Sequence, residues 1–494
     1  MKTTFDISEA TISKLHDAYR AGTTTAREVV QSYLDRIDAK DRGPEGINSV
    51  VELSPTVLDD AAQIDQKYAK DGQFAGPLHG VPVLVKDQIE VGGMSTSYGS
   101  EIAEGYIPPR DSSVVAALRN AGAIILGTTT MPDFATSWFS TSSRSGMTKN
   151  PYDLSRDPGG SSSGTAASVA ANFTLVGIGG DTGGSIRLPA SFCNLVGVRV
   201  TPGLISRDGM SSLVTPQDTP GPMARTVEDA ARLLDVLVGF DNKDPYSSAA
   251  HIAHHEGSFT DGLNESVVSG KKFGVLREAF GDATDPDGAR VNTVIENALD
   301  KIRAAGGETI DVQIDDLMHL AGFTSLYNTR SHSDMDAFFQ ERPDTGVTGM
   351  SDVISSGRFH PKLDLLMGIA ASPENPKDDP EYLDRMLVQQ VFQRTVVSLL
   401  ADLELDAIVF PDVKLPAPTH EDVLSDKWTC LTYPTNTIIA SQLHFPAATV
   451  PVGFTDNGLP IGLEIMGAPY DEKRLMLNAA AVERAAGERR APQL

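Results

Sequence analysis

The stretch from Pro158 to Pro189 constrains this chain more than any other, because two glycine-rich clusters flank a segment that can fold regularly. The first cluster runs from Gly159 to Gly164 and the second from Gly179 to Ser185, and each contains serine. Glycine opens backbone conformations that other residues avoid and lets a substrate approach the main chain. Successive free N–H groups in such a loop can converge on one oxyanion. The stretch therefore predicts an acyl-transfer site beside a serine hydroxyl.

Two other interpretations of this stretch fit less well. A flexible Gly/Ser linker would lack the Ala/Ser/Val segment, which can form a helix, and the apolar run from Phe173 to Ile178, which suits a buried strand. A phosphate-binding loop would end in Gly-Lys-Ser/Thr, or would place Gly-x-Gly-x-x-Gly between a strand and a helix, and this stretch does neither. The acyl-transfer interpretation is therefore favoured.

The stretch resembles the defining motif of the amidase signature family, whose serine hydrolases use a Ser–cis-Ser–Lys triad. The family's nucleophile ends a Gly-Gly-Ser, here Ser185, and its bridging serine follows an earlier Gly-Gly, here Ser161. Its lysine lies in an apolar run of the form Gly-Val-Pro-x-x-x-Lys-Asp, which this chain matches from Gly80 to Asp87 with Lys86. The three elements occur in the family's order and spacing. The resemblance therefore implies that Lys86, Ser161 and Ser185 are the catalytic residues.

The resemblance also implies the residues around this triad. Main-chain N–H groups of Thr182, Gly183 and Gly184, together with that of the nucleophile, would line the oxyanion hole. Ser162 and Arg187 match family positions that support the triad through hydrogen bonds. No metal or organic cofactor is expected, because the chain itself supplies base, nucleophile and oxyanion donors.

The chemistry implied is the hydrolysis of a carbon–nitrogen amide bond through an acyl-enzyme. Ser185 would attack the carbonyl carbon, and Ser161 would relay its proton to a neutral Lys86, which returns it to the leaving nitrogen. Lysine has a pKa of about 10.4, so a neutral amine near pH 8 needs a depression of roughly 2 units. Burial behind an apolar strand can provide this depression. Asp87 would oppose it, but neighbours on a strand point to opposite faces.

Composition limits the fold class and the partners. The 494 residues are 40% hydrophobic and 22% charged, which is typical of a soluble globular protein. A formal net charge of −25 argues against a nucleic-acid partner. Cys193 and Cys430 imply no disulfide framework. Without a signal-peptide core or a membrane-length apolar run, we expect a cytoplasmic protein with no membrane partner, and a homodimer stays open.

Strands that alternate with helices predict an α/β fold with a parallel or mixed sheet. The resemblance implies one large domain over residues 1–494, with a mixed, mostly parallel central sheet covered by helices on both faces. Within it we expect a helical layer over 1–70, a catalytic core over 71–240 and a helical, irregular insertion over 320–400 that shapes the substrate pocket. The predicted strands and, after them, two predicted helices are 81–85, 123–126, 195–200, 273–276, 407–410, 448–452 and 460–466; 112–121 and 226–238.

Several functions stay open. A stand-alone amidase for small or peptidic amides comes first, because the run from Ser206 to Arg225 is similar to that of bacterial peptide amidases. A glutaminase subunit of a tRNA-charging amidotransferase complex comes second, and an inactive scaffold third. The intact triad argues against the scaffold. The natural amide substrate is not fixed by the sequence.

Four other features are alternative site candidates. Gly160 to Gly164 fits the Gly-x-Ser-x-Gly nucleophile elbow with Ser162, but no buried strand precedes it. Cys193 in an apolar run favours core packing over nucleophilic catalysis. The cluster from His251 to Glu256, which includes His254 and His255, is not a His-Glu-x-x-His metal helix. His444, where family members often have Gly-x-Pro, either contacts substrate or packs as an ordinary side chain.

Overall fold

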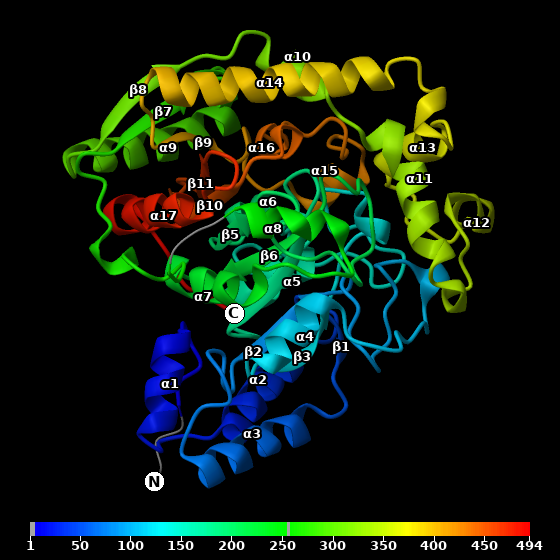
Figure 1. Ribbon diagram of the computed structural model, residues 1–494, viewed down its shortest axis with the longest axis vertical. Coiled ribbons are helices and arrows are strands. Elements are labelled where there is room, and N and C mark those ends of the chain that lie inside the picture. The colour runs from blue at the N-terminus through cyan, green and yellow to red at the C-terminus, as the bar shows by residue number, and fades with distance from the viewer. Residues whose placement is uncertain (1–4, 254–256) are drawn as a thin grey trace.

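The computed structural model describes residues 5–253 and 257–494, so the segment 254–256 of the histidine cluster lies outside the described residues. Its α-helices surround one sheet (Figure 1). The strands are β1 (Val50–Leu53), β2 (Pro82–Lys86), β3 (Ile124–Thr129), β4 (Val176–Asp181), β5 (Val196–Arg199), β6 (Thr219–Ala224), β7 (Lys272–Leu276), β8 (Glu308–Val312), β9 (Ala407–Pro411), β10 (Ala447–Phe454) and β11 (Pro460–Met466).

The helices fall between these strands and after them. They are α1 (Ile12–Arg20), α2 (Ala26–Lys40), α3 (Val57–Asp71), α4 (Ser113–Asn120), α5 (Ser163–Ala170), α6 (Arg187–Phe192), α7 (Val227–Leu237), α8 (Ala249–Ile252), α9 (Pro286–Ala304), α10 (Leu317–Phe323), α11 (Tyr327–Gln340), α12 (Met350–Ser356), α13 (Asp364–Ala370), α14 (Tyr382–Asp402), α15 (His420–Leu424), α16 (Ile438–Leu443) and α17 (Glu472–Ala486).

In the described residues the sheet has eleven strands in the order β1-β3-β2-β4-β6-β5-β10-β11-β9-β7-β8. β2 pairs in parallel with β3 and β4, and β7 pairs in parallel with β8 and β9. The other pairings are antiparallel, including the β10–β11 hairpin, which a short turn closes. The expected mixed sheet is confirmed. The expected predominance of parallel pairs is not, because β6 enters antiparallel between β4 and β5.

Both faces of the sheet are covered, as expected. Along β9, Val409 packs into a core shared with α9 and α17, whereas its neighbours Ile408 and Phe410 pack into another core with α14 and α16. This alternation is the period-two pattern of a strand with a buried face on each side. The apolar runs chosen from the sequence as strands are therefore buried on both faces.

The N-terminal layer is mainly helical, with one correction. α1, α2 and α3 lie together at one end of the molecule (Figure 1). The predicted capping box of α2 is present, with reciprocal bonds between Thr25 and Glu28. Residues 50–53, expected to be helical, form β1 and pair antiparallel with β3. Val50 and Val51 are β-branched and favour a strand once β3 offers an edge.

The segment 320–400 is mostly helical, as expected, and it forms a distinct layer. Helices α11, α12 and α13 share an apolar core with residues of the 98–139 segment, such as Phe134 and Phe139. They lie together along one side of the molecule, while α14 crosses its top edge (Figure 1). Among the described residues, no helix is both long and apolar enough to cross a membrane.

Candidate active site

The sheet brings Lys86 beside the glycine-rich loop. Lys86 is the last residue of β2, as predicted, and β2 pairs in parallel with β4, which ends at Asp181. The carboxyl ends of neighbouring parallel strands lie at one edge of a sheet, where α/β proteins place their sites. The loop from Thr182 to Ser185 begins at this edge, directly after β4.

Lys86 is fully buried and contacts Ser161. Its Nζ donates to Ser161 Oγ over 2.8 Å and to the Gly180 carbonyl oxygen over 3.2 Å. Burial lowers the pKa of Lys86 to about 7, although Asp181 and Asp218 act in the opposite direction. A lysine in this state is a mixture of ammonium and free amine near neutral pH, so it can both accept and return a proton.

Ser161 and Ser185 are connected through the backbone between them. The Gly160–Ser161 peptide bond is cis. The N–H of Ser162 donates to the Ser185 carbonyl oxygen over 3.1 Å. Ser162 Oγ exchanges hydrogen bonds with Gly180, whose carbonyl oxygen and N–H both lie 3.2 Å away. Ser185 is 4% exposed, and no hydrogen bond joins its hydroxyl to another described residue.

Asp181 holds the loop in place. Its carboxylate accepts the N–H groups of Gly184 over 2.9 Å and Ile186 over 3.1 Å. Burial alone would raise the pKa of Asp181, but the guanidinium groups of Arg187 and Arg199 hold it below its usual range. The Gly184 N–H is thus already engaged. This differs from the expectation that it points at an oxyanion.

Two glycines of the loop are required by contact with distant segments. A Cβ on Gly183 would lie 2.2 Å from the Tyr327 hydroxyl oxygen of α11. Gly184 has φ +114°, and a Cβ there would lie 1.8 Å from Thr437 Oγ1, just before α16. Tyr327 and Thr437 therefore cover the loop, and neither was identified from the sequence.

Comparison with known proteins places this geometry in a family. The sequence model of the Amidase family matches residues 28–476. The chain belongs to this family. It is therefore an amide-hydrolysing enzyme, and the predicted family and fold class are confirmed.

Its relatives in this family include two kinds of protein. A subunit of the glutamyl-tRNA(Gln) amidotransferase of Methanosarcina mazei is 34% identical over 93% of this chain and 94% of the relative. Among solved structures, the peptide amidase of Stenotrophomonas maltophilia is 32% identical, with a TM-score of 0.86 over 98% of this chain and 99% of that one. A peptide amidase in complex with the competitive inhibitor chymostatin gives 0.87 at 32% identity, over 99% and 100% of the two chains.

Arg187 of this amidase is the centre of a buried charged network. Its guanidinium pairs with Asp181 and Glu464 and donates to the Thr437 carbonyl oxygen over 2.8 Å and to Ser441 Oγ over 2.7 Å. Arg187 therefore ties the residue two positions after Ser185 to β11 and α16. The resemblance assigned it a supporting role, and these contacts show how it reaches both halves of the sheet.

A pair of buried carboxyl groups lies behind Arg187. Asp412 and Glu464 are within hydrogen-bonding reach of each other, and burial raises the pKa of Asp412 to about 6. Burial also raises the pKa of Glu464, against the effect of Arg187. The two groups are best stabilised with one proton between them.

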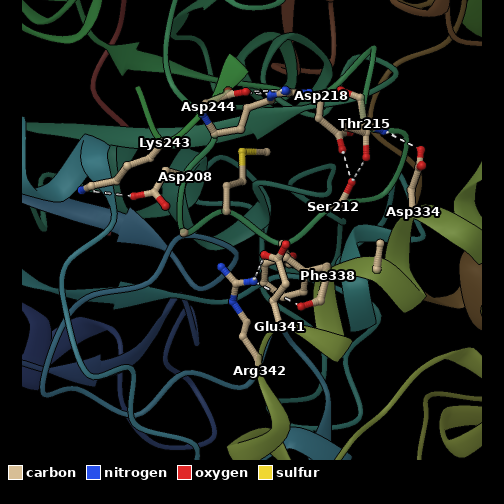
Figure 2. A pocket seen from close by; sticks show the side chains of 15 residues that line it. Asp208, Ser212, Thr215, Asp218, Lys243, Asp244, Asp334, Phe338, Glu341 and Arg342 are labelled. Carbon is tan, nitrogen blue, oxygen red and sulfur yellow. Dashed lines mark hydrogen bonds and ion pairs between the residues drawn. The ribbon is translucent and has the colours of Figure 1, made fainter. Parts of the chain in front are cut away.

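A pocket of about 280 Å³ adjoins the loop of this amidase (Figure 2). One wall is the segment 207–218, and another is α11, with Asp334 and Phe338. Asp218 accepts a hydrogen bond from Thr182 Oγ1 over 2.5 Å, and Gln217 Nε2 donates to the Thr182 carbonyl oxygen over 2.6 Å. The pocket wall is thus bonded to the first residue of the loop.

Charged side chains that line this pocket are mostly paired with one another. Arg207 forms an ion pair with Asp244 over 2.7 Å, and Lys243 lies 3.6 Å from Asp208. Figure 2 shows the Lys243–Asp208 pair on the side of the pocket away from Asp334. The pocket therefore presents a polar wall without an uncompensated cluster of one sign.

Other candidates from the sequence lie away from the Lys86–Ser161 pair or serve the fold. The Asp87 carboxylate accepts from Ser97 and Gly99 and not from Lys86. The Cys193 thiol donates to the Pro158 carbonyl oxygen over 3.6 Å, and burial raises its pKa. His444 lines a different cavity, beside Tyr470.

His444 and the histidine cluster add no metal site in the part of the chain that the structure describes. The His444 ring nitrogen Nε2 lies 3.4 Å from Gln389 Nε2, and burial lowers its pKa to about 4. No group of three or more potential metal ligands occurs among residues 5–253 and 257–494.

Proposed function

We propose that this amidase uses Lys86, Ser161 and Ser185 as a catalytic triad and forms an acyl-enzyme on Ser185. The observation that carries the proposal is the 2.8 Å contact from the buried Lys86 Nζ to Ser161 Oγ. A buried lysine with a lowered pKa has a fraction of free amine at neutral pH, which is the form that a general base requires. Ser161, adjacent in sequence to the residue that binds the Ser185 carbonyl oxygen, is the natural proton carrier between them.

The reaction begins when Ser185 Oγ attacks the amide carbonyl carbon. Its proton passes to Ser161, whose own proton passes to the Lys86 amine. The carbonyl oxygen becomes an oxyanion, and the C–N bond breaks as the nitrogen takes the proton back from Lys86 through Ser161. Water then attacks the acyl-enzyme in the same way and releases the carboxylic acid and free Ser185.

We assign the oxyanion hole to the N–H groups of Gly183 and Ser185, with Thr182 next to them. No hydrogen bond to another described residue occupies these two donors, whereas Gly184 donates to Asp181. Gly184 then serves the hole by fixing the loop. Donors held in place before the reaction stabilise the developing charge without reorganisation.

The substrate class that we propose is a peptidic or other small amide, hydrolysed by the chain without partner proteins. Support comes from the similarity to peptide amidases over nearly the whole length of both chains. The pocket beside Thr182 offers room for the part of the substrate beyond the scissile carbonyl.

A second function is favoured by the 34% identity to the amidotransferase relative. In that case the chain would release ammonia from glutamine within a complex. A peptide amide and free glutamine, each given to the purified chain, separate the two proposals. Turnover of the peptide amide alone supports the first, and turnover of glutamine that rises only with partner subunits supports the second.

Modification of the nucleophile tests the triad itself. A fluorophosphonate probe should label Ser185, located by mass spectrometry, and Ser185→Ala should abolish both labelling and turnover. Cys193→Ala and Ser162→Ala serve as comparisons. An adduct on Ser162, or turnover that survives Ser185→Ala, would contradict the assignment.

A further inference from the structure

Tyr327 is a buried tyrosine that reaches the proposed oxyanion loop from a distant part of the chain. It is the first residue of α11, in the segment 320–400, and is 7% exposed. Its hydroxyl oxygen occupies the position that a side chain on Gly183 would take, because a Cβ there would lie 2.2 Å from it. The phenol therefore lies directly on the backbone that precedes Ser185.

The Tyr327 hydroxyl makes no hydrogen bond to any residue that the structure describes. Other buried tyrosines do: Tyr433 donates to the Leu415 carbonyl oxygen over 2.7 Å, and Tyr98 to Glu90 over 2.9 Å. Buried tyrosine hydroxyls usually find a partner. An unused donor beside a reaction centre indicates that the partner is the substrate.

The acceptors nearest to this region are already occupied. The Asp181 carboxylate binds the N–H groups of Gly184 and Ile186 and two guanidinium groups. The Asp218 carboxylate binds the Thr182 hydroxyl and the N–H groups of residues 213 and 214. Neither carboxylate is left to receive the Tyr327 proton, so the phenol is available as a donor.

The side from which Tyr327 approaches indicates which part of the substrate it meets. In the proposed mechanism the leaving nitrogen faces Ser161, which returns its proton. Tyr327 instead covers Gly183 as part of the insertion. The helix that it opens continues to Asp334 and Phe338 on the wall of the pocket in Figure 2. The acyl part of the substrate lies on that side.

We propose that the Tyr327 hydroxyl donates a hydrogen bond to an oxygen acceptor in the acyl part of the substrate. Tyr327 thereby selects amides with an acylamino group next to the scissile carbonyl, as in peptides, over simple alkyl amides. This inference rests on the proposed function. A site built to hydrogen-bond a substrate group discriminates against analogues that lack the group, because the site's own polar atom is then left unpaired.

The test compares two amides that differ only in this acceptor: N-acetylphenylalanine amide and 3-phenylpropionamide. Wild-type enzyme should have the higher kcat/KM for the acetylated amide. Tyr327→Phe keeps the ring and removes the hydroxyl. It should lower kcat/KM for the acetylated amide about 10-fold or more and change that for 3-phenylpropionamide less than about 2-fold.

Tyr433→Phe is the matched control, because it removes another buried tyrosine hydroxyl whose partners are carbonyl oxygens of the chain. It should change both substrates by the same factor. An equal loss on both substrates in Tyr327→Phe would overturn the inference and leave the proposed function standing. Wild-type enzyme that hydrolyses neither amide would contradict the proposed function, and the inference with it.

Discussion

Lys86 illustrates how burial changes the chemistry of a single residue. A solvated lysine holds its proton until about pH 10, so it is a poor base at neutral pH. In this amidase the end of β2 lies inside the sheet, and the Lys86 ammonium has only a hydroxyl and a carbonyl oxygen as partners. Because neither partner is charged, burial outweighs the more distant carboxylates and the pKa of Lys86 falls to about 7.

The pH dependence of turnover follows from this lowered pKa. The base must be neutral, so kcat/KM should fall as pH drops through about 7 and reach a plateau on the alkaline side. Lys86→Ala should lower the rate of amide hydrolysis about 10²–10⁴-fold. Lys86→Arg should not restore it, because guanidinium stays protonated.

Two comparisons sharpen this test of the lysine. Amide hydrolysis should suffer more than ester hydrolysis in Lys86→Ala, since an amine leaves only when it is protonated. The exposed Lys427 gives a control alanine variant with an unchanged pH profile. A Lys86→Ala enzyme with the wild-type acid limb would remove lysine from the mechanism.

Gly184 supports a second prediction at the residue scale. Alanine there would adopt a φ that side chains rarely tolerate, and its Cβ would overlap Thr437. The loop must then shift, so kcat should fall about 100-fold or more, as when an oxyanion donor is lost. Gly22→Ala is the control: Gly22 also has positive φ, at +65°, but has open space around it. Similar kcat losses in the two variants would show that general destabilisation is the cause.

The candidate site could be predicted from the sequence only where its residues share a motif. Lys86, Ser161 and Ser185 each lie in a short run whose residues act together, so the runs could be recognised. Tyr327 and Thr437 could not, because their role is a contact with glycines far away in the chain. Steric fit between distant segments leaves no local signal.

At the scale of elements, the strands found from the sequence were the buried apolar ones, such as β9 and β11. β6 was missed because Pro220 and Pro222 argue against an interior strand. The structure tolerates both prolines because β5 pairs only with Met223 and Ala224, beyond them. β4 starts later than predicted and continues through glycines, since the pairing with β6 holds them extended.

The carboxyl pair that joins β9 and β11 should make stability depend on pH. A carboxyl whose pKa is about 6 in the folded protein and near 4 when unfolded stays protonated longer in the folded state. Stability should therefore fall as pH rises from about 4 to about 6 and then level off. A shift of two units corresponds to at most about 3 kcal/mol.

Asp412→Asn isolates this effect. The amide oxygen can still accept from Thr449, and the amide nitrogen can donate to Glu464. The free energy of unfolding at pH 8 should rise by about 1–3 kcal/mol, and the slope between pH 4 and 6 should flatten. The exposed Asp71→Asn is the control. Denaturant titrations at several pH values measure both, and an unchanged slope in Asp412→Asn would contradict the assignment.

At the scale of the whole molecule, the formal net charge of −25 influences the substrates that arrive. Its field attracts cations, and salt screens it. For a peptide amide with a lysine side chain, kcat/KM should fall several-fold between about 20 mM and 500 mM salt. A neutral peptide amide of the same length should change little. Equal salt dependence for both would exclude electrostatic steering.

The order of the strands has a consequence for synthesis of the chain. Lys86, Ser161 and Ser185 leave the ribosome within the first 240 residues, yet β5 gains its neighbour β10 only much later. Arg187 meets Glu464 across a separation of 277 residues. A nascent chain that already carries every proposed reactive group thus lacks the carboxylate that neutralises Arg187 and the strand that covers β5. Hydrolytic competence arrives late in translation, when the second half of the sheet joins the first.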